Sequence, residues 1–232
     1  MNENRYERQL MLPELGVEGQ KKIRSSKVLL IGVGGLGSPI STYLTGAGIG
    51  TLGLMDDDVV SVTNLHRQVL YAECEVGLSK AEQAKKRLSA LNSDVKIETY
   101  PFRLTKENAE QIISKYDLVV DGCDNFATRY LIDDVCHQLG KPYVYGSIQG
   151  LNGQVSVFNV GEKARRYRDL YPEEETQDYV PSKAVLGVTP AIVGSVEANQ
   201  VLQLVADFGT PLVNKLWTID LRTMESWTMD LF

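Results

Sequence analysis

Apolar residues occur in short runs along the first 160 residues, and segments with a helical period separate these runs. Most runs are rich in Val, Leu and Ile, and several end in glycine or an acidic residue. This pattern is typical of buried strands that end at a loop. The strands predicted in this way span residues 26–32, 50–58, 95–102, 117–125, 142–150 and 153–160.

Between the strands, apolar positions recur every three or four residues, which predicts amphipathic helices. The clearest is 79–92, where Ala81, Ala84, Leu88 and Leu91 share one face and basic residues lie between them. A short helix followed by a linker is predicted within residues 1–25. Further helices are predicted at 38–48, at 105–116 with a cap signal at Thr105, at 127–140 with a stop at Gly140, and at 189–209.

The last third of the chain differs from this alternation. Residues 161–183 have no apolar period and are dense in charge, so we expect a long loop. Residues 215–232 alternate between apolar and polar, which predicts an antiparallel hairpin that turns near Arg222–Glu225. Strands alternating with helices, followed by an antiparallel end, predict a single α/β domain with a mixed sheet over residues 1–232. We divide it into an N-terminal helical arm (1–25), a parallel half (26–145) and a second half (146–232).

Composition narrows the class of protein. The chain has 232 residues, of which 43% are hydrophobic and 23% charged, as in ordinary globular proteins. Its net charge of -6 argues against non-specific nucleic-acid binding, and its longest apolar run is far too short to span a membrane. The polar N-terminus does not resemble a secretory signal. We therefore expect a cytoplasmic protein that binds neither nucleic acid nor membrane.

The three cysteines, Cys74, Cys123 and Cys136, form no C-x-x-C pair. This argues against a disulfide framework and against a four-cysteine zinc site. A lone cysteine is more often a small buried hydrophobe than a nucleophile.

A glycine-rich loop, IGVGGLGSP, joins the first predicted strand to the first predicted helix. Gly32, Gly34 and Gly37 fit G-x-G-x-x-G, and Gly35 adds a fourth glycine. Such a loop permits a tight turn, close approach of a phosphate and packing of helix on strand, while the helix start attracts anions. The loop predicts a Rossmann-like nucleotide site. Asp56 follows Gly37 by 19 positions, close to the expected place of an acid that holds the ribose of NAD.

The residues further along favour a triphosphate over NAD. Asn64, Arg67 and Gln68 follow the acidic run 56–58, and Lys80 begins the helix at 79–92. Arg67 can neutralise a phosphate with two hydrogen bonds. Lys80 alone would be an ordinary surface lysine, but together with Arg67 it gives a pair of cations near the phosphate loop.

Two acids, Asp121 and Asp124, end another predicted strand at the same edge of the sheet, where an acid could hold Mg²⁺. An arginine, a lysine and an acid around a phosphate loop suit nucleotidyl transfer better than hydride transfer. NAD-dependent redox chemistry remains an alternative, but it gives Arg67, Lys80 and Asp124 no role.

The order and spacing of these motifs resemble the ThiF/MoeB/HesA family, bacterial relatives of ubiquitin-activating enzymes. The motifs are RYERQ, GVGGLGSP, the DDD strand end, TNLHRQ, VGLSK, and DGCDN followed by TR. The resemblance continues through GSIQGLNGQVSVF and VTPAIVGSVEANQVLQL, so it covers nearly the whole chain. It is closest to ThiF, because the chain is short and has no rhodanese extension.

The resemblance implies an adenylyltransferase that uses ATP and Mg²⁺. Its substrate would be the C-terminal glycine carboxylate of a ubiquitin-like sulfur carrier ending in Gly-Gly, and pyrophosphate would be released. Residues 146–232 would bind the carrier, with 161–183 as a crossover loop over its tail. Arg8 would reach the partner's site in a homodimer. The implied catalytic residues are Arg8, Arg67, Lys80 and Asp124, with Asp124 binding Mg²⁺. The implied nucleotide-binding residues are Gly32, Gly34, Gly35, Gly37, Asp56, Asp58, Asn64, Arg67, Gln68, Lys80, Asp124 and Asn125.

The chain departs from the family at two places. Arg166 and Asp169 stand where many relatives have the first of two C-x-x-C pairs, so we expect no zinc site, and the two residues could form an ion pair instead. Ser182 stands where some relatives have a cysteine that takes part in sulfur chemistry. We therefore expect the enzyme to stop at the acyl-adenylate.

The carrier and the pathway stay open at this point. We favour a ThiS-like carrier for thiamine thiazole synthesis. A MoaD-like carrier for molybdenum cofactor synthesis and a small-molecule carboxylate are alternatives, as is a silent dimer that only binds the carrier. Intact Arg8, Arg67, Lys80 and Asp124 argue against the silent dimer.

Overall fold

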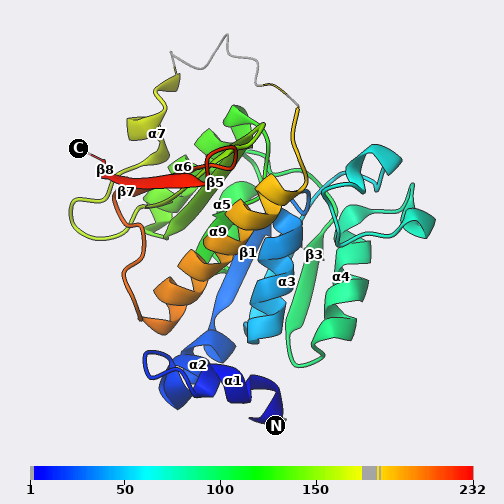
Figure 1. The fold of residues 1–232 in the computed structure, drawn as a ribbon, viewed down its shortest axis with the longest axis horizontal. Coiled ribbons are helices and arrows are strands. Elements are labelled where there is room, and N and C mark those ends of the chain that lie inside the picture. Colours follow the sequence, from blue (N-terminus) through cyan, green and yellow to red (C-terminus); the bar gives the residue numbers. More distant parts are fainter. Residues whose placement is uncertain (1–2, 174–181, 183, 232) are drawn as a thin grey trace.

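The computed structural model describes residues 3–173, 182 and 184–231. They form one eight-stranded sheet with helices on both of its faces (Figure 1). The strand order is β3-β2-β1-β4-β5-β6-β7-β8. The predicted α/β fold with a mixed sheet is therefore confirmed.

The first five strands are parallel, as the alternation of strands and helices predicts. The chain runs outward from β1 to β3 and then returns to place β4 on the other side of β1. In open parallel sheets, ligands bind beside such a reversal, at the carboxyl ends of the strands. The strands are β1 (Lys27–Ile31), β2 (Thr51–Met55), β3 (Lys96–Tyr100), β4 (Leu118–Asp121) and β5 (Tyr143–Gln149).

The remaining strands extend the sheet in antiparallel order. They are β6 (Asn152–Phe158), β7 (Lys215–Asp220) and β8 (Glu225–Asp230). The predicted C-terminal hairpin is confirmed, with its turn at residues 221–224. Strand β8 forms the exposed edge of the sheet.

Helices form a layer on each face of the sheet. One layer contains α3 (Gly37–Ala47), α4 (Lys80–Leu91) and α9 (Val188–Ala206), and the other contains α5 (Ala109–Ile113) and α6 (Phe126–Leu139). Alternate side chains of β1 enter the two layers: Val28 and Leu30 pack in the first core, Leu29 and Ile31 in the second. This alternation is the geometric consequence of a strand that is covered on both sides.

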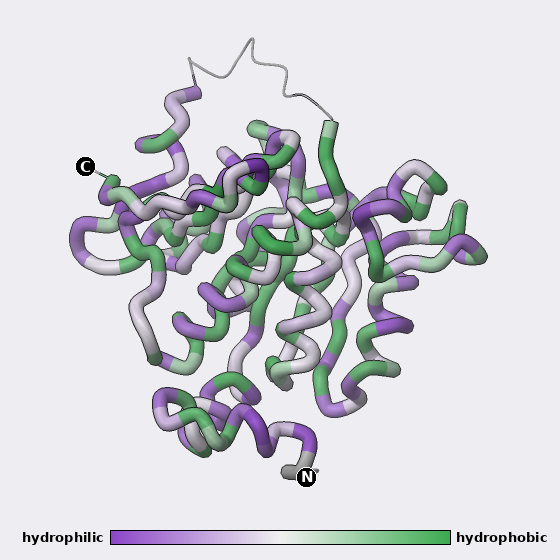
Figure 2. Tube along the Cα trace, in the orientation of Figure 1, coloured by the Kyte–Doolittle hydropathy of each residue, from purple (hydrophilic) through white to green (hydrophobic). Residues whose placement is uncertain are grey.

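Hydropathy follows this layering. Apolar residues run along β1, while apolar and polar residues alternate along the helices beside it and along the arm (Figure 2). Within the part of the chain that the structure describes, no helix is both long enough and apolar enough to cross a bilayer.

The arm contains more helix than predicted. It consists of η1 (Glu3–Tyr6), α1 (Glu7–Leu10) and α2 (Gly16–Ser25). The predicted linker is wrong, because Gly19 and Ile23 form a buried face of α2 that packs against α9. A Cβ on Gly19 would lie 2.7 Å from Leu15 Cδ1, so a larger residue there would have to displace the Leu15 side chain.

Two other local predictions are wrong. Helix α5 begins at Ala109 and not at Thr105; the residues before it form a turn in which the Thr105 N–H donates to Asn108 Oδ1 at 2.9 Å. The described part of 161–183 is not loop throughout, because it contains α7 (Tyr167–Leu170), whose Tyr167 is fully buried. Residues 174–181 and 183 lie outside the described residues. Short 3₁₀ turns, η2 (Val62–Asn64) and η3 (Glu73–Glu75), lie between β2 and α4.

Candidate active site

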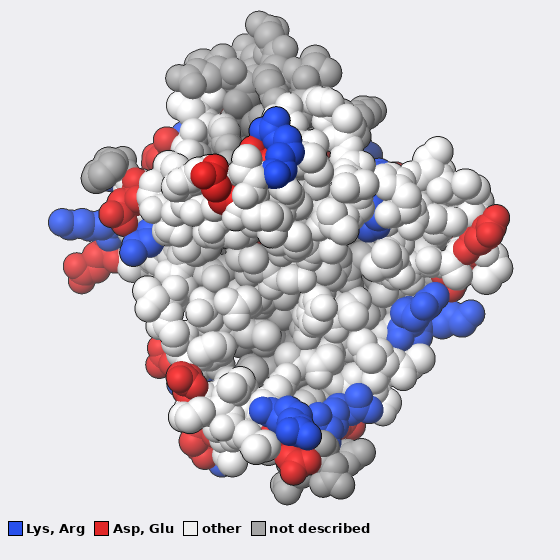
Figure 3. Space-filling model, viewed as in Figure 1, with Lys and Arg blue, Asp and Glu red and all other residues white. Residues whose placement is uncertain are grey.

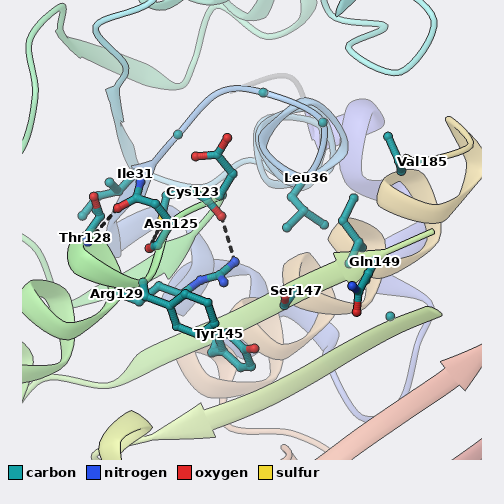
Figure 4. Close-up of a pocket in the computed structure, with 18 of the residues that line it drawn as sticks. Ile31, Leu36, Cys123, Asn125, Thr128, Arg129, Tyr145, Ser147, Gln149 and Val185 are labelled. Atoms are coloured by element: carbon teal, nitrogen blue, oxygen red, sulfur yellow. Dashed lines mark hydrogen bonds between the residues drawn. The ribbon is translucent and has the colours of Figure 1, made fainter. Parts of the chain in front are cut away.

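A cavity of about 1030 Å³ opens at the carboxyl ends of β1, β2, β3 and β4 and continues over β5, β6 and β7. Its first part is lined by the glycine loop, the acids after β2 and the loop after β4. Its second part is lined by polar residues of the antiparallel half, among them Gln154, Thr218 and Asp220. The close-up in Figure 4 shows Cys123, Asn125, Arg129, Tyr145, Ser147 and Gln149 around this cavity. The cavity therefore joins the two halves of the sheet.

The glycine loop has the close backbone contacts that its sequence predicts. Gly32 has φ +91, and a Cβ on it would lie 2.5 Å from the Gly122 carbonyl oxygen. Gly37 packs helix on strand: its Cβ would lie 2.2 Å from the Gly32 carbonyl oxygen. Gly34 and Gly35 line the cavity, and Gly37 lies behind them. The loop can thus bring main chain close to a phosphate.

The three acids after β2 have different partners. Asp56 accepts from the Val33 N–H at 2.8 Å and from the Asp58 N–H at 2.9 Å. Burial raises the pKa of Asp56, although these two hydrogen bonds oppose the rise. Asp57 pairs with Arg103 at 3.1 Å. Asp56 is therefore fixed to the glycine loop and can accept further hydrogen bonds, as a ribose-binding acid must.

Lys80 lies beside these acids at the start of α4. Its side chain is almost fully buried, and its Nζ lies 2.9 Å from Asp58 Oδ2. The Lys80 N–H also donates to the Asp58 carbonyl oxygen at 3.0 Å. Asp58 thus holds a buried ammonium group at the cavity wall, where it can meet an anion.

Arg67, Gln68 and Asn64 come from the turn after η2. Arg67 and Gln68 line the cavity. Asn64 is half-buried, is not among the lining residues, and accepts through its carbonyl oxygen from the N–H groups of Arg67 and Gln68 at 3.0 and 2.9 Å. Gln68 is buried, and its Oε1 has no hydrogen-bond partner among the described residues. The turn brings the arginine to the glycine loop, because Arg67 Cδ lies 3.7 Å from a Cβ built on Gly35.

Asp121 and Asp124 do not share one role. Asp121 is fully buried, with Arg129 Nε 2.9 Å and the Tyr143 hydroxyl 3.0 Å from its Oδ2. It is enclosed in this network and does not line the cavity.

Asp124 is exposed at the cavity and makes no side-chain hydrogen bond or ion pair with the described residues. A free carboxylate beside a phosphate site fits Mg²⁺, which takes one or two carboxylates and completes its shell with phosphate and water oxygens. Asn125 lies next to it and caps α6 by accepting from the Thr128 N–H at 2.9 Å (Figure 4).

Sequence reasoning missed Arg129 as a site residue. Its Nη2 donates to the Cys123 carbonyl oxygen at 2.8 Å, drawn as a dashed line in Figure 4, and to the Gly146 carbonyl oxygen at 3.2 Å. Its guanidinium also lies 5.3 Å from the centre of the Tyr145 ring. Arg129 therefore ties the loop that carries Asp124 to β5. Arg129 lies in the first turn of α6, and although the TR motif contains it, its spacing gave no signal of this role.

Cys123 lies in that loop and could be mistaken for a nucleophile. Burial raises the pKa of its thiol, and the nearby Asp121 carboxylate raises it further. At neutral pH it is a thiol, whereas nucleophilic cysteines react as thiolates.

Ion pairs stabilise the segment in which relatives would have the first cysteine pair, but they do not join the two residues that we predicted. Arg166 does not pair with Asp169 through its side chain; its Nη2 lies 3.0 Å from Asp133 and 2.7 Å from Asp134, both on α6. Asp169 accepts from the Arg166 backbone N–H at 2.8 Å. The predicted Arg166–Asp169 ion pair is wrong because Asp169 caps α7, which turns the arginine toward α6.

Two further predicted residues lie at the margins of the site. Ser182 lines the cavity, is exposed, and accepts from the Ala184 N–H at 3.2 Å, as in an ordinary loop turn. Arg8 lies on α1 and does not line the cavity of its own chain.

Comparisons with known proteins agree with this fold. A family model described as the ThiF family matches residues 6–231. The chain is 48% identical to the "Sulfur carrier protein adenylyltransferase" of Thermus thermophilus, covering 94% of this chain and 83% of the relative. It is 43% identical to the "Probable adenylyltransferase/sulfurtransferase MoeZ" of Mycobacterium tuberculosis, covering 98% of this chain but 59% of that relative.

Among solved structures, a crystal structure of E. coli MccB with AMPCPP and MccA aligns with a TM-score of 0.85 and 25% identity, covering 99% of this chain and 72% of that one.

Proposed function

The chain belongs to the ThiF family, and from that premise we propose that it is an ATP-dependent adenylyltransferase acting on the C-terminal glycine carboxylate of a ubiquitin-like sulfur carrier protein. One observation carries the proposal. The glycine loop, Arg67, Lys80 and Asp124 line one cavity, although they are spread over 90 positions of the chain. NAD-dependent hydride transfer would leave the two cations and the free acid without a function.

The proposed chemistry is governed by charge. A glycine carboxylate is already ionised near pH 7, so it needs no general base. Its difficulty is to approach a polyphosphate of the same sign. Arg67 and the buried Lys80 place positive charge where the triphosphate would lie, and a cation acts strongly in a cavity with little water.

The reaction proceeds by attack of a carboxylate oxygen on the α-phosphorus of ATP. The bond from that phosphorus to its bridging oxygen breaks, and pyrophosphate leaves with the electron pair. Arg67 and Lys80 stabilise the charge that develops on the departing phosphates. Asp124 would hold Mg²⁺, which when bound would supply Lewis-acid stabilisation of the same charge.

Recognition of the nucleotide is assigned to the residues around Asp56. Its carboxylate is fixed by two backbone N–H groups and retains acceptor capacity for ribose hydroxyls. Gly34 and Gly35 leave main chain open to the phosphates, and the N-terminus of α3 lies directly behind them.

The carrier is proposed from the relatives and from the shape of the cavity. The second part of the cavity, over β6 and β7, gives an extended tail a path toward the α-phosphate. We favour a ThiS-like carrier of thiamine thiazole synthesis. A MoaD-like carrier is the alternative that the MoeZ relative supports. A peptide or small-molecule carboxylate is the alternative suggested by MccB, whose structure contains MccA.

We also propose a homodimer in which Arg8 completes the site of the partner subunit. The face over α3 and α9 carries few charges, and charged side chains surround it (Figure 3). Exposed apolar side chains of the arm and of α3 are Met11, Leu12, Val17 and Tyr43. Exposed apolar surface of this kind favours association. The position of Arg8 outside its own cavity is consistent with a role in trans.

The enzyme is proposed to stop at the acyl-adenylate. Ser182 replaces the cysteine of some relatives, and the thiol of Cys123 is not ionised near neutral pH. A covalent adduct between enzyme and carrier, detected by mass spectrometry, would contradict this part of the proposal.

ATP–pyrophosphate exchange with purified carriers tests the proposed function. We expect exchange with a ThiS-like carrier that ends in Gly-Gly, and none with the same carrier lacking its last glycine. Exchange with only a MoaD-like carrier would change the pathway. Tight NAD binding without exchange would overturn the proposal.

A further inference from the structure

Helix α7 is held to α6 by a network of five charged side chains. Arg168 binds Asp134 with two hydrogen bonds, Nε to Oδ1 at 2.9 Å and Nη2 to Oδ2 at 2.7 Å, and its Nη1 lies 2.6 Å from Glu173. Arg166 bridges Asp133 and Asp134 at 3.0 and 2.7 Å. Isolated surface ion pairs contribute little, but bidentate geometry and a network are the exceptions. Asp133 is also fully buried, so its charge needs these partners.

The aromatic side of α7 fixes where the helix lies. Tyr167 is fully buried, and its ring centre is 5.2 Å from that of Tyr145 and 5.3 Å from that of Tyr171. The Tyr167 N–H donates to Asp133 Oδ1 at 3.0 Å, so the ionic and aromatic contacts meet at one residue. The Tyr130 hydroxyl donates to the Tyr171 carbonyl oxygen at 3.1 Å. The position of Tyr171 thus depends on how α7 sits on α6.

Tyr171 is the residue of this segment that reaches the cavity. It is half-buried and lines the cavity, and its hydroxyl accepts a hydrogen bond from Gln154 Nε2. The same nitrogen donates to the Tyr145 hydroxyl at 2.7 Å. A tyrosine hydroxyl that accepts in this way keeps its own hydrogen to donate. Tyr171 can therefore offer a donor to a carbonyl or carboxylate oxygen in the cavity.

This donor is distant from the phosphate site. Gln154 lies on β6, which is three strands from β1 in the sheet. At the usual spacing between neighbouring strands, about 14 Å separates β6 from β1. The distance suits the acceptor that carries the carboxylate, and not ATP.

We propose that Arg166 and Arg168 are positioning residues for the acceptor: by holding α7 on α6 they place the Tyr171 hydroxyl beside Gln154, where it binds the extended chain of an acceptor. The proposal rests on the proposed adenylyltransferase function for the identity of that acceptor. The positioning of Tyr171 itself does not depend on it.

Arg168→Gln is the test variant, and Arg165→Gln is its matched control. Both remove one positive charge from the same segment, but the Arg165 side chain makes no hydrogen bond or ion pair with the described residues. The first readout is the ¹⁹F resonance of 3-fluorotyrosine placed at position 171. We expect Arg168→Gln to shift or broaden it and Arg165→Gln to leave it unchanged. An unchanged resonance in Arg168→Gln overturns the positioning role, whatever the enzyme does.

The second readout is ATP–pyrophosphate exchange with the Gly-Gly carrier as the probe. Loss of one hydrogen bond corresponds to up to about tenfold in affinity. We expect Arg168→Gln and Tyr171→Phe each to raise KM for the carrier by up to about tenfold, with KM for ATP within about twofold of wild type. Arg168→Lys keeps an ion pair without its two-pronged geometry and should fall between Arg168→Gln and wild type.

The double variant Arg168→Gln/Tyr171→Phe should be no worse than the more impaired single variant, because both act through one hydroxyl. Additive effects, or equal increases in both KM values, overturn the assignment to the acceptor. Absence of exchange in the wild type contradicts the proposed function instead, and the fluorine resonance still decides the positioning.

Discussion

Asp121 ends β4 and Asp124 lies three positions later in the following loop, yet their surroundings are opposite. Asp121 is buried against Arg129 and Tyr143, while Asp124 is exposed at the cavity. The sequence showed two acids at a sheet edge but could not separate them. The separation comes from Arg129 on the following helix and Tyr143 on the next strand, and neither contact has a local signature. Only the exposed acid lines the cavity.

Asp124→Ala should abolish ATP–pyrophosphate exchange and leave the fold intact. Removing an electrostatic group of this kind costs on the order of 10²-fold or more in rate. Circular dichroism and thermal unfolding should match the wild type, because the side chain is exposed and makes no hydrogen bond or ion pair with the described residues. Asp57→Ala, at an exposed acid of the same cavity, is the control and should retain exchange. Wild-type exchange in folded Asp124→Ala would remove Asp124 from the mechanism.

A second buried carboxylate lies below the site. Glu197 on α9 is fully buried, and neither of its oxygens has a hydrogen-bond partner among the described residues. It fits only because residue 146 is glycine, since a Cβ there would lie 2.1 Å from the Glu197 carboxyl carbon. Burial raises the pKa of Glu197, and the Asp121 charge raises it further while Arg129 opposes the rise. The neutral form of Glu197 is therefore favoured more strongly in the folded protein than in the unfolded chain.

Glu197→Gln should be more stable than the wild type, by a margin that grows with pH. In the unfolded chain the carboxyl has a pKa of about 4.3, so above that pH unfolding releases a proton and wild-type stability falls. Glutamine has no proton to release. The difference in unfolding free energy should grow by at most about 1.4 kcal/mol per pH unit above pH 4.3. Denaturant titrations from pH 4 to 8 measure it, with exposed Glu82→Gln on α4 as the flat control. A constant difference would mean that Glu197 is ionised in the fold.

At the scale of elements, the site depends on three backbone segments that contact one another directly, with no side chain between them. The ends of β1 and β4 and the start of α3 touch through Gly32, Gly122 and Gly37. This contact sets the distance between the phosphate loop and the loop that carries Asp124. Glycine is required at these positions because a Cβ would collide with the backbone of the neighbouring segment.

Gly37→Ala should destabilise the protein and weaken ATP binding, whereas Gly46→Ala should not. The Gly37 Cβ would meet the Gly32 carbonyl oxygen at 2.2 Å, which forces the backbone to shift and costs about 1–3 kcal/mol. Gly46 lies in the same helix with nothing within 4 Å of its Cβ, so alanine there should add about 0.5–1 kcal/mol of stability. Thermal unfolding and KM for ATP are measured for both variants and should differ from wild type as described. Equal behaviour of the pair would show that the contact at Gly37 has no role.

The elements differ in how well the sequence predicts them. The strands and the long helices α3, α4, α6 and α9 follow from apolar runs and helical periods, because each helix packs against one of the two cores that cover the sheet. Within the predicted helical arm, the extent of α2 was not predicted because its buried face is short and uses glycine. Helix α7 was missed because its partners on α6 lie more than 30 positions earlier, and charged residues conceal the buried Tyr167.

At the scale of the molecule, one cavity crosses from the parallel to the antiparallel half of the sheet. The glycine motif and the acids predict its first part, since such residues have local spacing rules. The second part, with Gln154, Tyr171 and Thr218, has no spacing rule that points to a ligand, because strand pairing across long sequence distances assembles it. The sequence therefore predicts the nucleotide end better than the acceptor end.

The proposed dimer predicts that two inactive variants restore activity when their subunits are combined. If Arg8 acts in the partner's site, Arg8→Ala and Asp124→Ala homodimers should both be inactive, yet a mixture should recover activity. In a mixed dimer the Arg8→Ala subunit keeps its own Asp124 and receives Arg8 from its partner, so one of its two sites is complete. Equal mixing after subunit exchange makes half of the dimers mixed, which gives about a quarter of wild-type exchange. Size-exclusion chromatography with light scattering checks that each variant is dimeric. If the mixture stays inactive while mixed dimers form, Arg8 does not act in trans; full activity of Arg8→Ala alone would exclude it from the site.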